Sequence, residues 1–136
     1  MQHPFELSYL DHVAIRARNM DVSIRWYENV IGMKKYQLEA WGPFPIFMLS
    51  GKSGVAIFPA RLTDPEIPIS KNIKIDHFAF NVTKAHFDNA QAHFKANNIP
   101  FEFQDHTYFH SIYLKDPDGH TVELTTLVVP AEEFFK

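Results

Sequence analysis

The chain repeats a short motif, and this repeat limits the folds that it can adopt. Leu10-Asp11-His12-Val13-Ala14-Ile15 opens the first half and Ile75-Asp76-His77-Phe78-Ala79-Phe80 opens the second, at an offset of 77 − 12 = 65 residues. Each motif is typical of a strand that begins with Asp-His and is followed by the spacing of an amphipathic helix. The repeat therefore predicts two similar halves that share one core.

A hairpin near the end of the second half carries a carboxylate in an apolar strand. Asp116-Pro117-Asp118-Gly119 is typical of a type I turn, and Glu123 follows it among Val and Leu residues. A carboxylate that faces a protein interior is costly unless it is paired or binds a metal; the alternative is an edge strand with Glu123 in water. At the offset of 65, Gly119 corresponds to Gly54, interpreted as a second turn glycine, and Glu123 corresponds to Phe58.

Both halves show the expected element order β-α-β-β-β. In the first half we expect strands over 7–17, 33–40, 46–49 and 55–59, with a helix from a cap at Asp21 to Gly32. In the second half we expect strands over 75–82, 101–105, 109–115 and 120–127, with a helix from a cap at Thr83 to Asn97. These elements predict a single α+β domain over 1–136, with module one at 8–60, a linker at 61–74, module two at 75–127 and a C-terminal tail at 128–136 that docks as a short helix.

Composition excludes several classes of function. The formal net charge is −3 without a basic cluster, so we expect no nucleic-acid partner. There is no cysteine, which excludes disulfides and thiolate metal sites. No apolar run reaches about 18 residues, so we expect no membrane span. Because the N-terminus lacks a basic segment followed by an apolar one, we expect no signal peptide and a cytoplasmic location.

The strand pattern divides large apolar residues from smaller and more polar ones. The polar face is predicted to collect His12, Arg16, Ala56, Phe58, His77, Asn81, Tyr113, Thr121, Glu123 and Thr125. Two imidazoles and one carboxylate can bind a divalent metal on one side and leave positions open for a substrate. The alternative for either histidine alone is an ordinary strand residue, but three such residues with the same facing favour a metal site.

These features together resemble the vicinal oxygen chelate superfamily, the group of glyoxalases, bleomycin resistance proteins and extradiol dioxygenases. The resemblance covers about residues 8 to 127, and the hairpin ending in Glu123 is its most specific part. It implies a glyoxalase-like fold, in which two β-α-β-β-β modules pair into a curved sheet around a metal site. It also implies metal ligands at His12, His77 and Glu123. The fourth ligand of glyoxalase I and of methylmalonyl-CoA epimerase falls at Phe58, which argues against those isomerisations.

The same resemblance supplies two catalytic candidates. The extradiol signature is matched by His106, Tyr113, Asp116-Pro117 and the later glycine and glutamate, although Gln104 departs from its first position. It implies that Tyr113 binds a substrate oxygen and that His106 is an acid or base, with His110 as the rival histidine. The chain is rich in aromatic residues, with 13 Phe, 5 Tyr and 2 Trp. The expected substrate pocket consists of Phe58, Phe47, Phe109, Arg16 and Asn81.

We therefore expect an enzyme that chelates a small molecule through two vicinal oxygens, with a dioxygenase-type reaction favoured. One alternative is a glyoxalase-like lyase or a fosfomycin-type thiol transferase, and another is a non-catalytic binding or resistance module. The expected cofactor is one divalent ion, with Fe(II), Mn(II), Zn(II) and Ni(II) all compatible with the ligands. The expected partners are a small-molecule substrate and a second copy of the chain in a homodimer.

Overall fold

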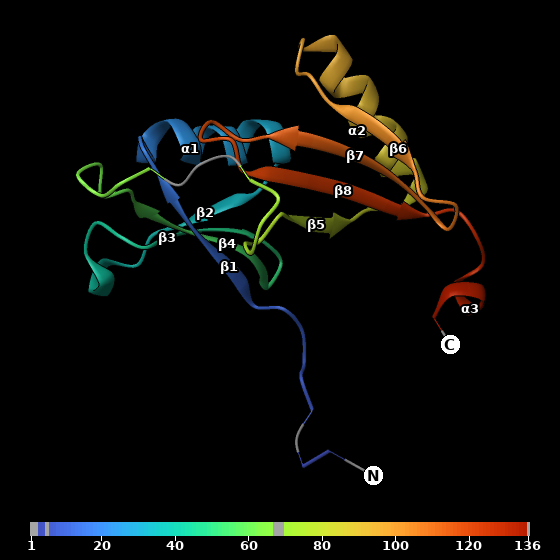
Figure 1. Cartoon of the computed structure of the whole chain (residues 1–136), viewed down its shortest axis with the longest axis horizontal. Helices are drawn as coiled ribbons and strands as arrows, with labels where there is room; N and C mark the ends of the chain where they lie inside the picture. The colour runs from blue at the N-terminus through green and yellow to red at the C-terminus, as the bar shows by residue number, and fades with distance from the viewer. Residues whose placement is uncertain (1–2, 5, 67–69, 136) are drawn as a thin grey trace. The chain divides into compact units, whose positions relative to one another are not determined.

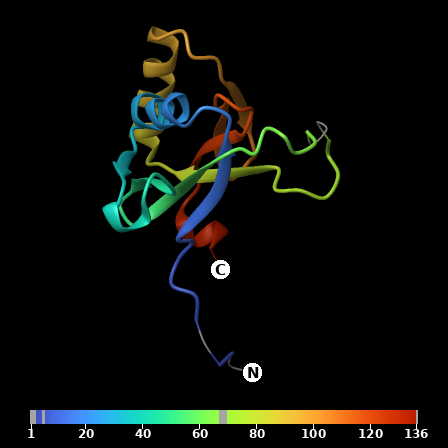
Figure 2. The same cartoon turned by 90° about the vertical axis from the view of Figure 1, so that its left-hand side faces the viewer.

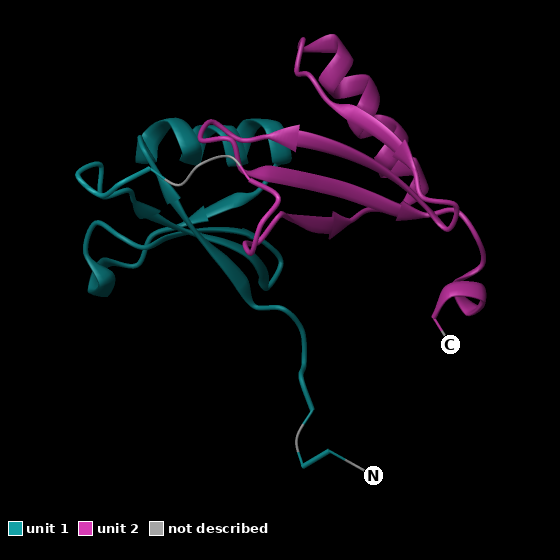
Figure 3. Cartoon of the chain, viewed as in Figure 1, with its two compact units in different colours: residues 1–66 teal, residues 67–136 magenta. Residues whose placement is uncertain are grey.

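Each half of the chain forms its own four-stranded mixed sheet with one principal helix (Figure 1). The computed structural model describes residues 3–4, 6–66 and 70–135. The chain divides into two units, Met1–Glu66 (unit 1) and Ile67–Lys136 (unit 2), which Figure 3 distinguishes by colour. Part of the expected linker, 67–69, and the last residue of the expected tail lie outside the described residues.

Unit 1 has the strand order β1-β4-β3-β2. Its elements are β1 (His12–Ala17), α1 (Met20–Trp26), a π-helical turn η1 (Tyr27–Ile31), β2 (Lys34–Tyr36), a 3-10 turn η2 (Glu39–Trp41), β3 (Ile46–Ser50) and β4 (Ser53–Pro59). Strands β1 and β4 are parallel, and β4-β3-β2 run antiparallel to one another. Helix α1 contacts β4.

Unit 2 repeats this topology as β5-β8-β7-β6. Its elements are β5 (His77–Asn81), α2 (Lys84–Ala96), β6 (Glu102–Asp105), β7 (Phe109–Lys115), β8 (Thr121–Leu127) and α3 (Ala131–Phe134). Strands β5 and β8 are parallel, while β8-β7-β6 are antiparallel. The β-α-β-β-β order of each half and the α+β class are confirmed.

Alternation along the strands gives each sheet a helix-facing side and an open face. In unit 1 the residues on the helix-facing side, with the helix residue Tyr27, are almost fully buried: Ile15, Ala17, Met48, Val55 and Ile57. In unit 2 the corresponding buried residues are Phe87 and Phe94 of α2 with Ile112, Leu114, Val122 and Leu124 of the sheet. Apolar burial on this side leaves the polar and aromatic residues on the open face.

The first strand begins later than the sequence pattern indicates, and the first helix begins earlier. Strand β1 begins at His12. Leu10 and Asp11 before it still contact β4, since Asp11 O accepts from Gly54 N at 3.1 Å, and exposed residues 6–9 lead away from the sheet of unit 1 (Figure 2). Helix α1 is capped by Asn19, whose Oδ1 accepts from Val22 N at 3.1 Å, so the expected cap at Asp21 is wrong. Asp21 instead lies in the first turn, where its charge favours the helix dipole.

The expected turn role of Gly54 is also wrong. Gly54 lies within β4 opposite Leu49, and the turn glycine of this hairpin is Gly51, with φ 63°. A Cβ at Gly54 would meet the Met48 carbonyl oxygen at 2.1 Å, so close backbone approach explains this glycine. In unit 2, Gly119 does occupy the turn, with φ 86° and its N–H donating to Asp116 O at 3.0 Å.

The other expected ends of helices and strands agree more closely with the structure. Thr83 caps α2 by accepting from His86 N at 3.2 Å, and Gly32 ends the first helical segment with φ 82°. The expected second strand, 33–40, is shorter, because β2 ends at Tyr36 and η2 follows. Within the part of the chain that is described, no helix is long and apolar enough to cross a membrane.

Candidate functional site

The two histidines that begin β1 and β5 are held in the same way. His12 Nδ1 lies 2.8 Å from Asp11 Oδ1, and His77 Nδ1 lies 2.8 Å from Asp76 Oδ1. A carboxylate on Nδ1 fixes the ring orientation and the tautomer, and it leaves Nε2 as the acceptor or metal-binding atom. This hydrogen bond also lowers the pKa of the Asp76 carboxyl, so the carboxylate stays ionised. The repeated Asp-His pair therefore gives each unit one oriented imidazole.

Glu123 is buried on β8, with 7% of its surface exposed. It pairs with Ala79 of β5 on one side and with Tyr113 of β7 on the other. Its Oε1 lies 3.0 Å from His77 Nε2. The carboxylate is thus directed at an imidazole rather than at water. Because Asp76 accepts the Nδ1 proton, the two facing atoms are both acceptors, an arrangement that a cation bound by both would satisfy.

Tyr113 and His106 extend this cluster along the open face of unit 2. The Tyr113 hydroxyl lies 2.7 Å from His106 Nε2, and the Tyr113 ring stands nearly perpendicular to both His77 and His106. Burial raises the pKa of the Tyr113 phenol, and the negative charge of Glu123 adds to this shift. The phenol therefore stays protonated at neutral pH and can donate a hydrogen bond.

Two expected pocket residues of unit 2 lie farther along the same face. Asn81 pairs with Thr125, and Phe109 pairs with Leu127. Asn81 stands four residues from His77, or about 13 Å along a strand, whereas Phe109 borders His106, because its carbonyl oxygen accepts from His106 N at 2.8 Å. Phe109 contacts the tail helix through Phe134, with ring centroids 4.7 Å apart. The structure thus brings together His77, Glu123, Tyr113 and His106, with Phe109 beside His106 and Asn81 farther along β5.

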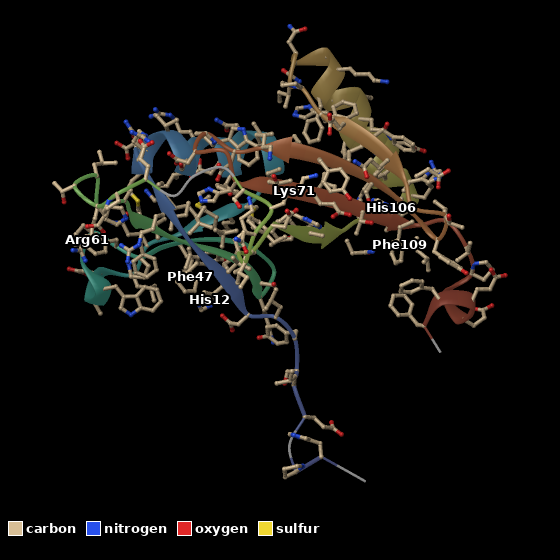
Figure 4. All side chains as sticks on the ribbon, in the orientation of Figure 1. His12, Phe47, Arg61, Lys71, His106 and Phe109 are labelled. Atoms are coloured by element: carbon tan, nitrogen blue, oxygen red, sulfur yellow. The ribbon has the colours of Figure 1, made fainter. Side chains whose placement is uncertain are left out.

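On unit 1, His12 belongs to an aromatic strip along the open face. Its ring lies 5.1 Å from that of Phe47, and Phe47 lies 5.2 Å from Trp41 (Figure 4). Toward the other end of β1, the Arg16 guanidinium lies 5.3 Å from the Phe58 ring centroid. Arg16 also donates to Pro59 O at 3.0 Å. This face presents one imidazole and one guanidinium separated by aromatic rings.

Strand register corrects the expected correspondence between the halves. Ala56 pairs with Phe47 as Glu123 pairs with Tyr113, and Ala56 pairs with Ala14 as Glu123 pairs with Ala79. The counterpart of Glu123 is therefore Ala56 and not Phe58, which corresponds to Thr125.

Glu123 aligns with Ala56 instead of Phe58 because the offset between the two halves is not constant. It is 77 − 12 = 65 at the histidines, 113 − 47 = 66 at β3 and β7, and 123 − 56 = 67 at β4 and β8. One extra residue before β7 and another in the β7–β8 turn shift the alignment by two. Since two residues preserve the facing of a strand, Phe58 still lies on the open face.

The rival histidine lies on the other side of the sheet. His110 packs against Phe103 at 5.1 Å between ring centroids, and its Nε2 lies 3.6 Å from Asp105 Oδ1. Since Phe103 also contacts Phe87 of α2, this is the helix-facing side. His106 rather than His110 therefore reaches Tyr113.

Two residues of the site have a role that we did not expect from the sequence. Asp11 and Asp76 orient the histidines, and the repeated Asp-His pair was the sequence signal for this role. Among residues 3–4, 6–66 and 70–135, no group of three or more His, Cys, Asp or Glu side chains is arranged to hold a metal ion. His77 and Glu123 belong to unit 2, whereas His12 belongs to unit 1.

Solved structures of similar fold cover nearly all of the chain. A glyoxalase/dioxygenase from Nostoc punctiforme is 19% identical with a TM-score of 0.75, covering 95% of this chain and 97% of its own. A lactoylglutathione lyase from Agrobacterium tumefaciens is 24% identical with a TM-score of 0.67, covering 88% of this chain and 94% of its own. A glyoxalase/bleomycin resistance protein/dioxygenase from Alicyclobacillus acidocaldarius is 21% identical with a TM-score of 0.68, covering 100% of both. At these identities the likeness establishes the fold alone.

The sequence itself gives the family. Residues 9–124 match the family described as the Glyoxalase/Bleomycin resistance protein/Dioxygenase superfamily, from just before the first Asp-His pair to just after Glu123. This range contains both Asp-His pairs and Glu123. The chain therefore belongs to the glyoxalase/bleomycin resistance protein/dioxygenase superfamily.

Proposed function

We propose that this protein is a metal-dependent enzyme that binds a small substrate through two neighbouring oxygens, with His12, His77 and Glu123 as the protein ligands of one divalent ion. The observation that carries the proposal is the approach of His77 Nε2 to Glu123 Oε1, at 3.0 Å. Both groups bind metals, and Asp76 leaves the Nε2 atom of His77 available. The identical Asp11–His12 contact supports His12 as the remaining imidazole ligand.

The donor set suits a divalent first-row metal. Two neutral imidazoles and one carboxylate are compatible with Fe(II), Mn(II), Zn(II) and Ni(II), and they leave coordination positions for a substrate. When bound, such an ion supplies a Lewis acid that holds and polarises two adjacent substrate oxygens. The half-exposed histidines allow a substrate to approach, and the buried Glu123 fixes one side of the ligand set.

Tyr113 and His106 are the proposed groups for handling protons. The raised pKa of Tyr113 keeps its hydroxyl protonated, so it donates to a substrate oxygen. His106 is within hydrogen-bond distance of that hydroxyl and is the proposed acid or base. An apolar or aromatic substrate would suit the aromatic residues Phe47 and Phe58 of unit 1 and Phe109 of unit 2. Arg16 and Asn81 offer polar contacts at the far ends of their strands.

Ala56 supports one reaction type over the other. Since its methyl group stands where unit 2 has Glu123, unit 1 has no carboxylate at that strand position for ligation or for proton abstraction. This favours a dioxygenase-type reaction over a proton-transferring isomerisation. A lyase is the second candidate, supported by the fold shared with the lactoylglutathione lyase of Agrobacterium tumefaciens.

Metal analysis of single variants tests this proposal. Loss of an outer-shell partner alone costs about 10–100-fold in metal affinity, so we expect His77→Ala and Glu123→Ala, which remove ligands, each to lower it by at least about 100-fold. Titration and elemental analysis of protein purified without chelator measure this. The matched control is His93→Ala, because His93 lies on α2 in the same unit and contacts Asn97 rather than the cluster. A full equivalent of metal at unchanged affinity in either ligand variant would show that the ion binds elsewhere. Activity assays on the metal-loaded protein then separate the two reaction types. Turnover of catechols supports a dioxygenase-type reaction, and turnover of methylglyoxal with glutathione supports a lyase.

A further inference from the structure

The connection between β2 and β3, residues 37–45, contacts the open face of unit 1, and we call it the aromatic loop. Its 3-10 turn η2 carries Trp41, whose ring lies 5.2 Å from that of Phe47 on β3. Three residues later, the Phe44 ring lies 6.4 Å from that of Phe58 on β4. Since Phe47 and Phe58 both belong to the open face, the loop contacts this face at two points.

Each of these contacts leads to a polar residue of β1. The Phe47 ring also lies 5.1 Å from the ring of His12, a proposed metal ligand, and Figure 4 labels both residues. The Phe58 ring centroid lies 5.3 Å from the Arg16 guanidinium. Trp41 is therefore two ring contacts away from His12. The aromatic loop thus lengthens the aromatic strip that begins at the proposed ligand.

The two rings of the aromatic loop remain half-exposed. Trp41 has 43% of its surface exposed, and Phe44 has 45%. The sheet beside them carries small residues, since Ala56 pairs with Phe47 on one side and with the exposed Ala14 on the other. Single exposed apolar residues are common, but apolar surface gathered beside a polar group is typical of a ligand site. The exposed rings therefore have surface left to contact a bound molecule.

We propose that Trp41 and Phe44 are specificity-determining residues that contact an aromatic ring of the substrate, while two oxygens of the same molecule bind the metal at His12. Aromatic rings attract one another in offset or edge-to-face pairs with centroids about 4.5–7 Å apart, and the gain exceeds that of apolar burial alone. The pairs already present have interplanar angles of 48° for Trp41–Phe47 and 67° for Phe44–Phe58. The inference rests on the proposed function for the place of the oxygens, and it names the substrate class as aromatic rather than only apolar.

Two hydroxamates test the preference for an aromatic ring. Benzohydroxamate and acetohydroxamate offer the same two neighbouring oxygens to a metal and differ only by phenyl in place of methyl. Calorimetric titration of the zinc-loaded protein should give tighter binding of benzohydroxamate. We expect Trp41→Leu and Phe44→Leu, which keep an apolar side chain but remove the ring, each to lower the affinity for benzohydroxamate by about two- to tenfold. The affinity for acetohydroxamate should stay the same, and Trp41→Phe should retain most of the preference.

The aromatic loop offers a matched control. Leu38 is 49% exposed in the same loop and carries no ring, so Leu38→Ala should leave both affinities unchanged. Unchanged benzohydroxamate affinity in Trp41→Leu and Phe44→Leu, or an equal loss for the two hydroxamates, would overturn the proposal. An equal loss of benzohydroxamate affinity in Leu38→Ala would overturn it as well, since the effect would then come from the loop's apolar area. If Trp41→Leu keeps benzohydroxamate binding and halves the sedimenting mass, the loop contacts a second copy of the chain and the proposal also fails.

The outcome is separable from that of the metal proposal. The chain has two tryptophans, so Trp26→Phe leaves Trp41 as the only source of indole fluorescence. If the unmodified protein binds no zinc, but benzohydroxamate and not acetohydroxamate saturably quenches this fluorescence, the proposed function fails and the aromatic site stands. If zinc binds as proposed and neither Trp41→Leu nor Phe44→Leu changes the affinity for benzohydroxamate, the reverse holds. If zinc does not bind and neither hydroxamate changes the fluorescence, both fail.

Discussion

At the scale of single residues, the site of unit 2 places one buried acid between two oriented rings. Glu123 pairs across the strands with Tyr113, and its carboxylate contacts His77. A buried ionic group of this kind is seldom the most stable choice for a fold, because its desolvation cost competes with its contacts. The presence of a carboxylate at this buried position is therefore better explained by binding than by stability.

We predict a trade-off between stability and metal binding at Glu123. Glu123→Leu should raise the free energy of unfolding of the metal-free protein by about 1 kcal/mol, because a leucine fits an apolar strand and His77 remains half-exposed to water. The same variant should lose its metal. Urea denaturation with and without metal measures both effects. A leucine variant that is less stable without metal would contradict the view that the carboxylate is costly.

A second residue-scale prediction concerns the β7–β8 turn. Asp116, which is buried, accepts from His120 Nδ1 at 2.8 Å, and this hydrogen bond raises the pKa of His120 above its usual 6.5. A raised pKa in the folded state means that the stabilisation is fully present below the unfolded pKa and is lost as pH rises through the folded one. Unfolding free energies between about pH 5 and pH 9 should therefore decline less in His120→Gln than in the unmodified protein. The control His93→Gln should keep the full decline, and an identical profile in His120→Gln would show that this pair does not contribute.

At the scale of elements, the order and type of strands and helices could be predicted, but the register between halves could not. Apolar alternation indicated the strands, and Thr83 and Gly32 marked helix ends correctly. The alignment of Glu123 with Phe58 failed because single-residue differences in connection length accumulate along a strand pair, and an ungapped repeat does not reveal them. Likewise, the role of Gly54 depends on the neighbouring Met48 carbonyl, which only the paired strands show.

The corrected register gives a prediction for strand β4. Ala56→Glu should raise metal affinity by about tenfold or more by adding a carboxylate beside His12, at the cost of lower stability without metal, since Ala56 is buried. Phe58→Glu, two residues along the same face, should leave metal affinity unchanged, because its charge pairs with Arg16. Calorimetric titration of both variants compares the two positions directly. Tighter binding in Phe58→Glu and not in Ala56→Glu would contradict the register assignment.

At the scale of the whole molecule, each unit contributes one sheet with an open face and outer strands. The sheet of unit 1 ends at β1 and β2, and exposed apolar residues lie before β1 and at the end of the chain: Leu7, Tyr9, Leu10, Phe134 and Phe135. Sheet edges and apolar surface of this kind favour association. We propose a homodimer, and sedimentation velocity at micromolar concentration should give twice the mass of one chain. A single monomeric species over that range would remove this proposal.

Most directly testable is the proposal that His12, His77 and Glu123 are ligands of one divalent ion. Pulsed electron paramagnetic resonance of protein loaded with a paramagnetic divalent ion counts the imidazoles bound to the metal through the modulation from their remote nitrogens. Two bound histidines are predicted for the unmodified protein, and one is predicted for either His12→Ala or His77→Ala. A count that stays at two in His12→Ala, or that is zero in the unmodified protein, would contradict the account.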